Sequence, residues 1–199
     1  TITPMRKVCL ISGGTSGVGN AVALGLAELG AEVIILGRNS KRGEAAIEEI
    51  CGKTGNSKIT FLPVDLSVRN SIRGFAADFT KRYTRLDVLV NAAGILTLKR
   101  QLSPDGIELT FAVDFLSHFL LTNLLLDLLR KSAPARIITV AGSPNLLKEA
   151  RIDWEDIQFE RKKYNGVQAA VQAAYARLLF SIELAKRLEK SGVTSNAFH

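Results

Sequence analysis

The pattern of hydrophobic positions divides the chain into two kinds of segment. Short runs rich in β-branched and apolar residues are expected to be strands, and they cover residues 7–12, 32–36, 58–63, 86–91, 136–140 and 194–198. Longer stretches with helical periodicity separate them, at residues 17–30, 40–52, 68–83, 107–131 and 166–191. Strands that are apolar on both faces and alternate with helices predict a parallel sheet covered on both sides.

The predicted architecture is therefore a doubly wound α/β domain. A chain of 199 residues with 47% apolar residues can bury one substantial core, so residues 1–199 are expected to form a single domain. Residues 145–164 are the one long stretch without a regular pattern. A connection of this kind is either functional or simply exposed.

Composition excludes several classes of protein. No run approaches the roughly 20 apolar residues of a membrane-spanning helix, and residues 1–7 lack the apolar core of a signal peptide. Cys9 and Cys51 have neither CxxC spacing nor an even ladder of partners, which is typical of free thiols in a reducing compartment. These features predict a soluble, cytoplasmic protein with no membrane span, and no metal site is expected.

The formal net charge of +7 raises the question of nucleic acid. The basic residues are spread along the chain, however, and the aromatic residues, 7% of the total, do not interleave with a basic stripe. A stacking platform for bases therefore has no support. Binding of a nucleotide phosphate is a more local use of positive charge that remains open.

The first predicted strand, glycine-rich turn and helix form a candidate nucleotide site. The spacing of Gly13, Gly17 and Gly19 allows a tight turn, close approach of the backbone to a pyrophosphate and close packing of the helix on the sheet. The N-terminus of the following helix presents free N–H groups to the phosphates. A glycine-rich turn without a ligand is the simpler alternative, and the strand before it and the helix after it argue against that.

The end of the second predicted strand bears on the choice of cofactor. An acidic residue at this position would accept hydrogen bonds from the ribose 2′-hydroxyl, whereas Arg38 can pair with a 2′-phosphate. NADP(H) is therefore favoured over NAD(H). The alternative is that Arg38 is a solvated surface residue.

Several motifs in a consistent order resemble those of the short-chain dehydrogenase/reductase family. They are SGGTSGVG at residues 12–19, VDLS at 64–67 and VNAAG at 90–94, similar to the family's glycine motif, adenine-contacting acid and NNAG motif. The likeness continues through residues 103–126 and 180–199, so it covers nearly the whole chain, and it is greatest to the retinol-dehydrogenase-like branch. The resemblance implies a Rossmann fold.

The resemblance also implies a set of cofactor contacts. The glycine motif would contact the diphosphate and ribose, Asp65 and Leu66 the adenine, and the NNAG-like motif the adenosine side of the cleft. The predicted cofactor-binding residues are Gly13, Thr15, Ser16, Gly17, Val18, Gly19, Arg38, Asn39, Asp65, Leu66, Asn91, Ala92, Ala93 and Gly94. Asp65 could instead cap a turn, and Asn91 could only tie neighbouring strands together.

The catalytic residues that the resemblance implies are absent. In the family a tyrosine acts as acid or base, a lysine four residues later lowers its pKa, a serine orients the carbonyl and an asparagine supports a proton-relay water. An alignment without gaps places Ala170 and Ala174 at the tyrosine and lysine positions. Gly142 falls at the serine position and Asp114 at the asparagine position. No catalytic residue is predicted, because hydride transfer to a carbonyl needs a proton donor.

Four other side chains are candidates to replace the missing acid and base. Tyr175 lies five residues beyond Ala170, about 140° away around the helix, and more readily packs or faces solvent. Ser143 lacks a base and suits a turn before a proline. Asp114, buried near a cofactor, could have a raised pKa and act as an acid, although a polar helix residue is the simpler interpretation. His118 is more typical of a core or interface histidine.

Three hypotheses follow from the sequence. The first is an NADP(H)-binding homologue without tyrosine-dependent hydride transfer, with a role in nucleotide sensing or partner binding. The second is an active oxidoreductase that uses other acid–base groups such as Asp114. The third is a purely structural subunit that pairs with an active relative through residues 107–131 and 166–191, which form oligomer interfaces in the family. A homo-oligomer through the same two helices is also predicted. The resemblance further implies a C-terminal substrate-covering segment that this sequence does not contain.

Overall fold

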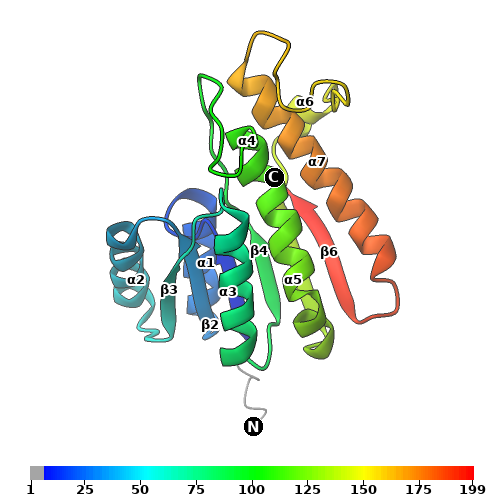
Figure 1. The fold of residues 1–199 in the computed structure, drawn as a ribbon. Helices are drawn as coiled ribbons and strands as arrows, with labels where there is room; N and C mark the ends of the chain where they lie inside the picture. The colour runs from blue at the N-terminus through cyan, green and yellow to red at the C-terminus, as the bar shows by residue number, and fades with distance from the viewer. Residues whose placement is uncertain (1–6) are drawn as a thin grey trace.

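Six parallel strands form the sheet at the centre of the computed structural model, which describes residues 7–199 (Figure 1). Their order across the sheet is β3-β2-β1-β4-β5-β6. The strands are β1 (Val8–Ser12), β2 (Glu32–Gly37), β3 (Ile59–Pro63), β4 (Val88–Asn91), β5 (Ala135–Val140) and β6 (Val193–Phe198). The doubly wound parallel sheet predicted from the alternating pattern is confirmed.

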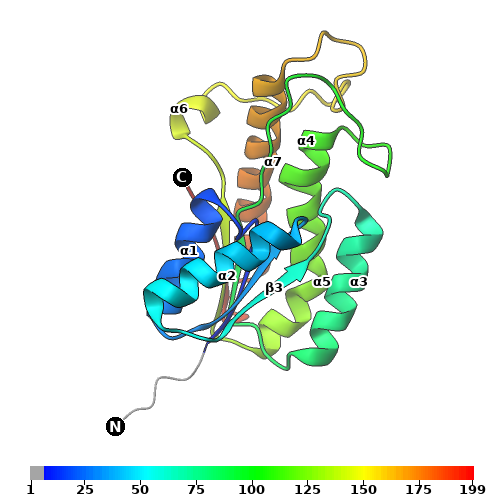
Figure 2. The same ribbon diagram turned by 90° about the vertical axis from the view of Figure 1, so that its left-hand side faces the viewer.

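Helices cover both faces of this sheet. The helices are α1 (Gly17–Glu28), α2 (Ser40–Thr54), α3 (Arg69–Arg82), α4 (Leu109–Phe111), α5 (Ser117–Lys131), α6 (Pro144–Leu147) and α7 (Gly166–Arg187), of which the short α4 and α6 lie beyond the sheet (Figure 1). Buried residues of α1 and α2 share one core cluster with alternate residues of β1 and β2, whereas α3, α5 and α7 share the cluster on the opposite face. Figure 2 shows α1 and α2 together on one side of the sheet.

Alternation along β1 explains why the strand is apolar from Val8 to Ile11. Leu10 contacts the cluster under α3, α5 and α7, and Cys9 and Ile11 contact the cluster under α1 and α2. All three side chains are completely buried. A strand between two helical layers has no solvent face, which is why its sequence shows no polar alternation.

The strand order reverses at β1, which pairs with β2 on one side and β4 on the other. In open parallel sheets a crevice forms at such a switch point, beyond the carboxyl ends of the strands. The residues that end the strands here are Ser12 in β1, Gly37 in β2 and Asn91 in β4. The fold thereby fixes where a ligand site is expected.

The helix expected at residues 107–131 begins at Leu109 and contains a π-helical turn, Ala112–Leu116, between α4 and α5. The Glu108 carboxylate caps its start by accepting hydrogen bonds from the Thr110 and Phe111 N–H groups. The 23-residue stretch Leu109–Lys131 is long and apolar enough to cross a membrane, contrary to the sequence-based expectation, but half of it is buried inside the domain. Buried core helices also reach this length and apolar composition, so these two properties do not indicate a membrane span.

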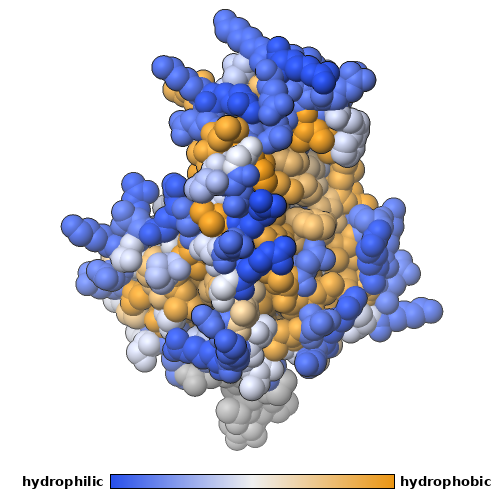
Figure 3. Space-filling view, viewed as in Figure 1, coloured by the Kyte–Doolittle hydropathy of each residue, from blue (hydrophilic) through white to orange (hydrophobic). Residues whose placement is uncertain are grey.

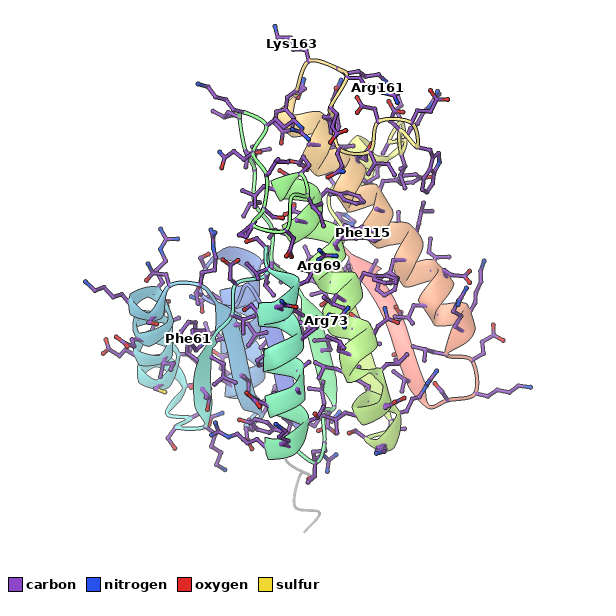
Figure 4. The ribbon with its side chains drawn as sticks, in the orientation of Figure 1. Phe61, Arg69, Arg73, Phe115, Arg161 and Lys163 are labelled. Carbon is purple, nitrogen blue, oxygen red and sulfur yellow. The ribbon has the colours of Figure 1, made fainter. Side chains whose placement is uncertain are left out.

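Other element boundaries differ from the predicted ones mainly at helix ends. α7 ends at Arg187 rather than at residue 191, because residues 188–192 turn back toward β6. The stretch at 145–164, expected to be irregular throughout, begins with the single turn of α6. Gln172 of α7 secures the remainder by accepting from the Asp153 N–H and donating to the Ile157 carbonyl. Figure 4 shows Arg161 and Lys163 extending from this loop into solvent.

Candidate dinucleotide site

A pocket of about 710 Å³ runs across the carboxyl ends of the strands, from β3 to β5. This size lies within the range of small-molecule and cofactor sites. Val64 to Ser67, after β3, line one end, the loop after β1 lies in the middle, and Ile95, Val113 and Val140 line the other end. The pocket therefore occupies the switch-point crevice that the topology predicts.

Twelve of the fourteen predicted contact residues line this pocket. They are Gly13, Thr15, Ser16, Gly17, Val18, Arg38, Asn39, Asp65, Leu66, Ala92, Ala93 and Gly94. Gly19 and Asn91 do not line it. The sequence reasoning missed Gly37, Arg42, Val64, Ser67, Ile95, Val113 and Val140 as lining residues. Most of these are immediate neighbours of predicted residues.

The glycine-rich turn has the geometry of a phosphate cradle. A Cβ atom at Gly13 would lie 2.6 Å from the Cα of Ala93, so no side chain fits between β1 and β4. A Cβ at Gly19 would lie 2.3 Å from the Gly13 carbonyl oxygen. Gly17 starts α1 with a φ of 56° in open space. The N-terminal N–H groups of α1 therefore face the pocket without obstruction, which fits the diphosphate of a dinucleotide.

Gly19 and Asn91 serve the site from outside the pocket. Gly19 is buried and allows α1 to lie against the turn. The Asn91 side-chain amide donates a hydrogen bond of 3.0 Å to Thr122 Oγ1 of α5. Its Oδ1 atom is buried and has no partner among the described residues. The predicted alternative was that Asn91 ties neighbouring strands together, but its side chain instead joins β4 to the helix α5.

Asp65 sits at the β3 end of the pocket and also stabilises its own turn. Its Oδ1 atom accepts hydrogen bonds from the Ser67 N–H, at 2.9 Å, and from the Ser67 hydroxyl, at 2.6 Å. The second oxygen of the carboxylate accepts no hydrogen bond from the described residues. Asp65 is half-buried and combines turn capping with a carboxylate oxygen that no described residue uses, at the lining of the pocket.

Two arginines border the pocket beside β2. Arg38 follows the strand, and Arg42 lies in the first turn of α2. Asn39 caps this helix, with its side chain accepting a hydrogen bond of 3.0 Å from the Arg42 N–H. Both arginines are exposed. Together they form a positive edge at which a phosphate on the adenosine ribose would find charge-assisted donors.

The positions matched to catalytic residues lie together at the opposite end. A Cβ at Gly142 would be 3.5 Å from the Cβ of Ala174, so these two positions are in contact. Gly142 has a φ of 117°, which side chains rarely adopt, so this backbone favours glycine. Ala174 is buried and Ala170, one turn earlier on α7, is half-buried. None of the three carries a group that can exchange a proton.

Asp114 is the titratable residue at this end. Its Oδ1 atom accepts a hydrogen bond of 2.9 Å from the Ile95 N–H. Oδ2 lies 3.5 Å from the place that a Cβ at Gly94 would take, directly behind the pocket wall. Burial raises the pKa of Asp114 from 3.8 to about 7, against the opposing effect of the Arg177 charge.

His118 and Arg177 complete a buried polar cluster behind the pocket. Burial lowers the pKa of His118 to about 3, so its imidazole is neutral. Sequence reasoning did not single out Arg177, although it lies three residues after Ala174 on the same helix face. It is the one buried lysine or arginine among residues 7–199, with 8% of its surface exposed. Its Nη2 atom donates to the Ala141 carbonyl at 3.4 Å.

The other candidates lie apart from the pocket lining. Tyr175 is half-buried on α7, and Ser143 is an exposed residue at the start of α6. Neither side chain makes a hydrogen bond with the described residues. No group of three or more His, Cys, Asp or Glu side chains positioned to hold a metal ion occurs within residues 7–199.

The fold and the position of the pocket are those of doubly wound proteins that bind nucleotides at the switch point of the sheet. A family model described as short chain dehydrogenase matches residues 7–151. Retinol dehydrogenase 13 of Homo sapiens is 40% identical over 193 residues, which cover 97% of this chain and 58% of the relative. Retinol dehydrogenase 12 of Mus musculus is also 40% identical over 193 residues, covering 97% of this chain and 60% of the relative.

Solved structures with similar folds also match nearly the whole chain. An uncharacterized protein from Mycobacterium Paratuberculosis has a TM-score of 0.82 and 33% identity, covering 96% of this chain and 67% of that one. The RhlG/NADP complex of Pseudomonas aeruginosa has a TM-score of 0.78 and 26% identity, covering 98% of this chain and 72% of that one. The chain belongs to the short-chain dehydrogenase family, in its retinol-dehydrogenase-like branch. It spans about 60% of the length of the retinol dehydrogenases that it matches.

Proposed function

We propose that this chain binds NADP(H) and does not carry out the tyrosine-dependent hydride transfer of its family, so that it acts as a nucleotide sensor or a partner-binding protein. One contrast carries the proposal. The glycine cradle and the pocket fit a dinucleotide, whereas Gly142, Ala170 and Ala174 offer no proton donor at the other end. Bound NADPH would supply a hydride, but reduction of a carbonyl also requires a proton.

The residues present support binding in a defined orientation. The turn after β1 would hold the diphosphate through backbone N–H groups, and Asp65 and Leu66 border the adenine end. Arg38 and Arg42 would pair with the 2′-phosphate that distinguishes NADP(H). The nicotinamide would then lie toward Ile95, Val113 and Val140. The NADP complex named for the similar RhlG structure agrees with this choice of cofactor.

A direct experiment tests the proposal. The purified protein is titrated with NADPH while the nicotinamide fluorescence is followed, and a panel of aldehydes and ketones is then added. Binding without oxidation of NADPH is the expected result. Saturable oxidation of NADPH would overturn the loss of hydride transfer, and absence of binding would overturn the cofactor assignment in favour of a structural subunit.

Asp114 supports a second candidate, an active oxidoreductase with a carboxylic acid as proton donor. A free Oδ2 atom beside Gly94 and a pKa near neutrality are the properties that such an acid needs. The relatives named retinol dehydrogenases favour activity on a carbonyl or alcohol. Turnover that disappears in Asp114→Asn, with NADPH binding retained, would establish this candidate in place of the first.

Replacing Arg38 with aspartate should shift the preference of the site from NADP(H) toward NAD(H). The new carboxylate would repel a 2′-phosphate and accept hydrogen bonds from a 2′-hydroxyl. We expect the affinity for NADPH relative to NADH to fall by about 100-fold, because a charge-assisted pair becomes a repulsion. Fluorescence titrations with both nucleotides measure the ratio.

Lys41→Asp is the matched control for this substitution. Lys41 is also exposed at the start of α2 and has the same charge, but it does not line the pocket. Its replacement should change the preference by less than about twofold. An unchanged preference in Arg38→Asp would contradict the role of the arginine.

Self-association through α5 and α7 is a further part of the proposal. Four large apolar side chains on these helices are exposed: Phe119 (44%), Val167 (55%), Leu179 (39%) and Ile182 (48%). Phe119 contacts Phe180 across the two helices, with ring centroids 5.1 Å apart. Figure 3 shows an extended hydrophobic surface over this part of the molecule, and contiguous patches of this kind mark interaction sites.

Charges on this surface should disrupt self-association. We expect Phe119→Glu combined with Ile182→Glu to weaken dimerisation by at least about 100-fold, because paired copies would bury like charges. Sedimentation equilibrium measures the dissociation constant. Leu29→Glu is the control, since Leu29 is 81% exposed at the end of α1, away from both helices. A wild-type protein that is monomeric at high concentration would exclude the interface.

A further inference from the structure

Two buried charges of opposite sign flank the end of the pocket where the nicotinamide would lie. Asp114 lies behind the wall made by Gly94 and Ile95 and accepts a hydrogen bond from the Ile95 N–H. Arg177 lies behind the wall that continues from β5, where it donates to the Ala141 carbonyl. Ile95 and Val140 line the pocket in front of these charges. The two side chains come from separate helical segments, the π-helical turn and α7.

Neither charge is neutralised by a close ion pair. No carboxylate among the described residues forms a salt bridge with Arg177, and its buried Nε atom has no hydrogen-bond partner there. Asp114 accepts only the Ile95 N–H bond within the described chain. Buried charges that lack a close partner act on their surroundings through a medium of low effective dielectric constant. A group bound in front of them therefore experiences both.

The two forms of a nicotinamide dinucleotide differ in the charge of the ring. The oxidised nicotinamide ring is a cation and the reduced ring is neutral, whereas their phosphates are the same. We propose that Asp114 and Arg177 determine which redox form this chain binds, and that a proton on Asp114 sets the preference. The inference rests on the proposed binding of NADP(H) at this pocket and adds the state of the ligand that the site distinguishes.

The charges around Asp114 determine how the preference for one redox form depends on pH. Arg177 faces it from α7, Glu108 from the segment before α4, and His118 lies one turn further along its own helical stretch. The Glu108 carboxylate accepts two N–H bonds of α4 and one from the Tyr164 hydroxyl. His118 is uncharged above about pH 4, because burial lowers its pKa to about 3. Arg177 remains a cation at every pH considered.

The protonation of Asp114 determines whether the preference for the oxidised form rises or falls with pH. Burial raises the pKa of its carboxyl group to about 7, so the group is neutral at pH 5.5 and Arg177 then repels the oxidised ring. At pH 8.5 the carboxylate is ionised and offsets the arginine. The ratio of dissociation constants, NADP⁺ over NADPH, should therefore fall as the pH rises through about 7. We expect this ratio to fall by about tenfold, because one unit of negative charge is added near the bound ring.

The test is measurement of both dissociation constants from pH 5.5 to 8.5, by NADPH fluorescence and by displacement with NADP⁺. Protonation of the 2′-phosphate affects both forms and cancels in the ratio. Asp114→Asn should give a ratio that does not change with pH and stays near the wild-type value at pH 5.5. Asparagine keeps an acceptor for the Ile95 N–H, so the local fold is retained.

Arg177→Met gives an independent readout. Without the cation the ratio should fall at pH 5.5, and its inflection should move to higher pH, because the Arg177 charge lowers the pKa of Asp114. Arg187→Met removes the same charge from an exposed position at the end of α7 and should reproduce the wild-type profile.

The outcomes separate this inference from the function on which it rests. If both forms bind and the wild-type ratio is independent of pH, the inference is overturned while NADP(H) binding stands. If neither form binds at any pH, the proposed function fails. A pH-dependent ratio that persists in Asp114→Asn would assign the proton to another group and would equally overturn the inference.

Discussion

Replacing Gly19 with alanine should reduce the affinity for NADPH by at least about 100-fold, or about 2.7 kcal/mol of binding free energy. The added Cβ would lie 2.3 Å from the carbonyl oxygen and 2.8 Å from the carbonyl carbon of Gly13. Both are backbone atoms, so the turn after β1 or the start of α1 must move. The cradle and the helix N-terminus would then no longer face the same point, although Gly19 itself does not line the pocket.

The same helix provides a matched control. Gly25 lies in the interior of α1, and a Cβ there would meet no atom within 4 Å. Gly25→Ala should leave NADPH affinity unchanged and raise the free energy of unfolding by about 0.5–1 kcal/mol, the gain in helix propensity. Titration and denaturant unfolding measure the two quantities. Affinity in Gly19→Ala within twofold of wild type would contradict the close-packing argument.

Restoring the missing proton donor should produce activity where the wild type has none. The variant Ala170→Tyr, Ala174→Lys and Asp114→Asn replaces three of the four substituted positions. We expect NADPH oxidation with a panel of aldehydes to rise at least about 100-fold above the wild-type background, the lower range of acid–base contributions. Steady-state absorbance of NADPH measures the gain.

Two features of the structure shape this experiment. Adding Gly142→Ser forces a side chain onto a φ of 117°, so the variant is made with and without it. A lysine at 174 would also lie near the Arg177 cation, which should lower the pKa of the new lysine. Ala170→Phe in the same background keeps the ring without the phenol and should be inactive. Activity in that control would mean that another group delivers the proton.

The fold was predictable because the sheet lies between two helical layers. Strands such as β1 and β2 must be apolar on both faces, and amphipathic helices must separate them, so the alternation is visible in the sequence alone. The π-helical turn and the shorter end of α7 were not predicted. Apolar spacing in these segments does not distinguish a π turn from an α turn, and tertiary contacts decide where helix ends lie.

The part of the site formed by the glycine turn was predictable from the sequence. The residues brought to the site by helix packing were less so. The glycine spacing predicted the tight turn after β1, and the position after β2 predicted that Arg38 lies at the pocket. Arg42 was missed, although it follows Asn39 by three residues and shares the first turn of α2. Arg177 was missed because an arginine on a helix is usually exposed. Its i+3 relation to Ala174 was the one available signal.

The π-helical turn, Ala112–Leu116, gives the two parts of this helix separate orientations. One extra residue in a turn rotates everything beyond it by about 100°, the angle of a single helical step. Residues before the shift can therefore be placed to suit the cleft, while Leu121, Leu125 and Leu129 keep their alignment with the sheet. Asp114 lies within this turn and the sheet-facing leucines lie beyond it, so the residue at the cleft and the residues of the core occupy different registers of one helix.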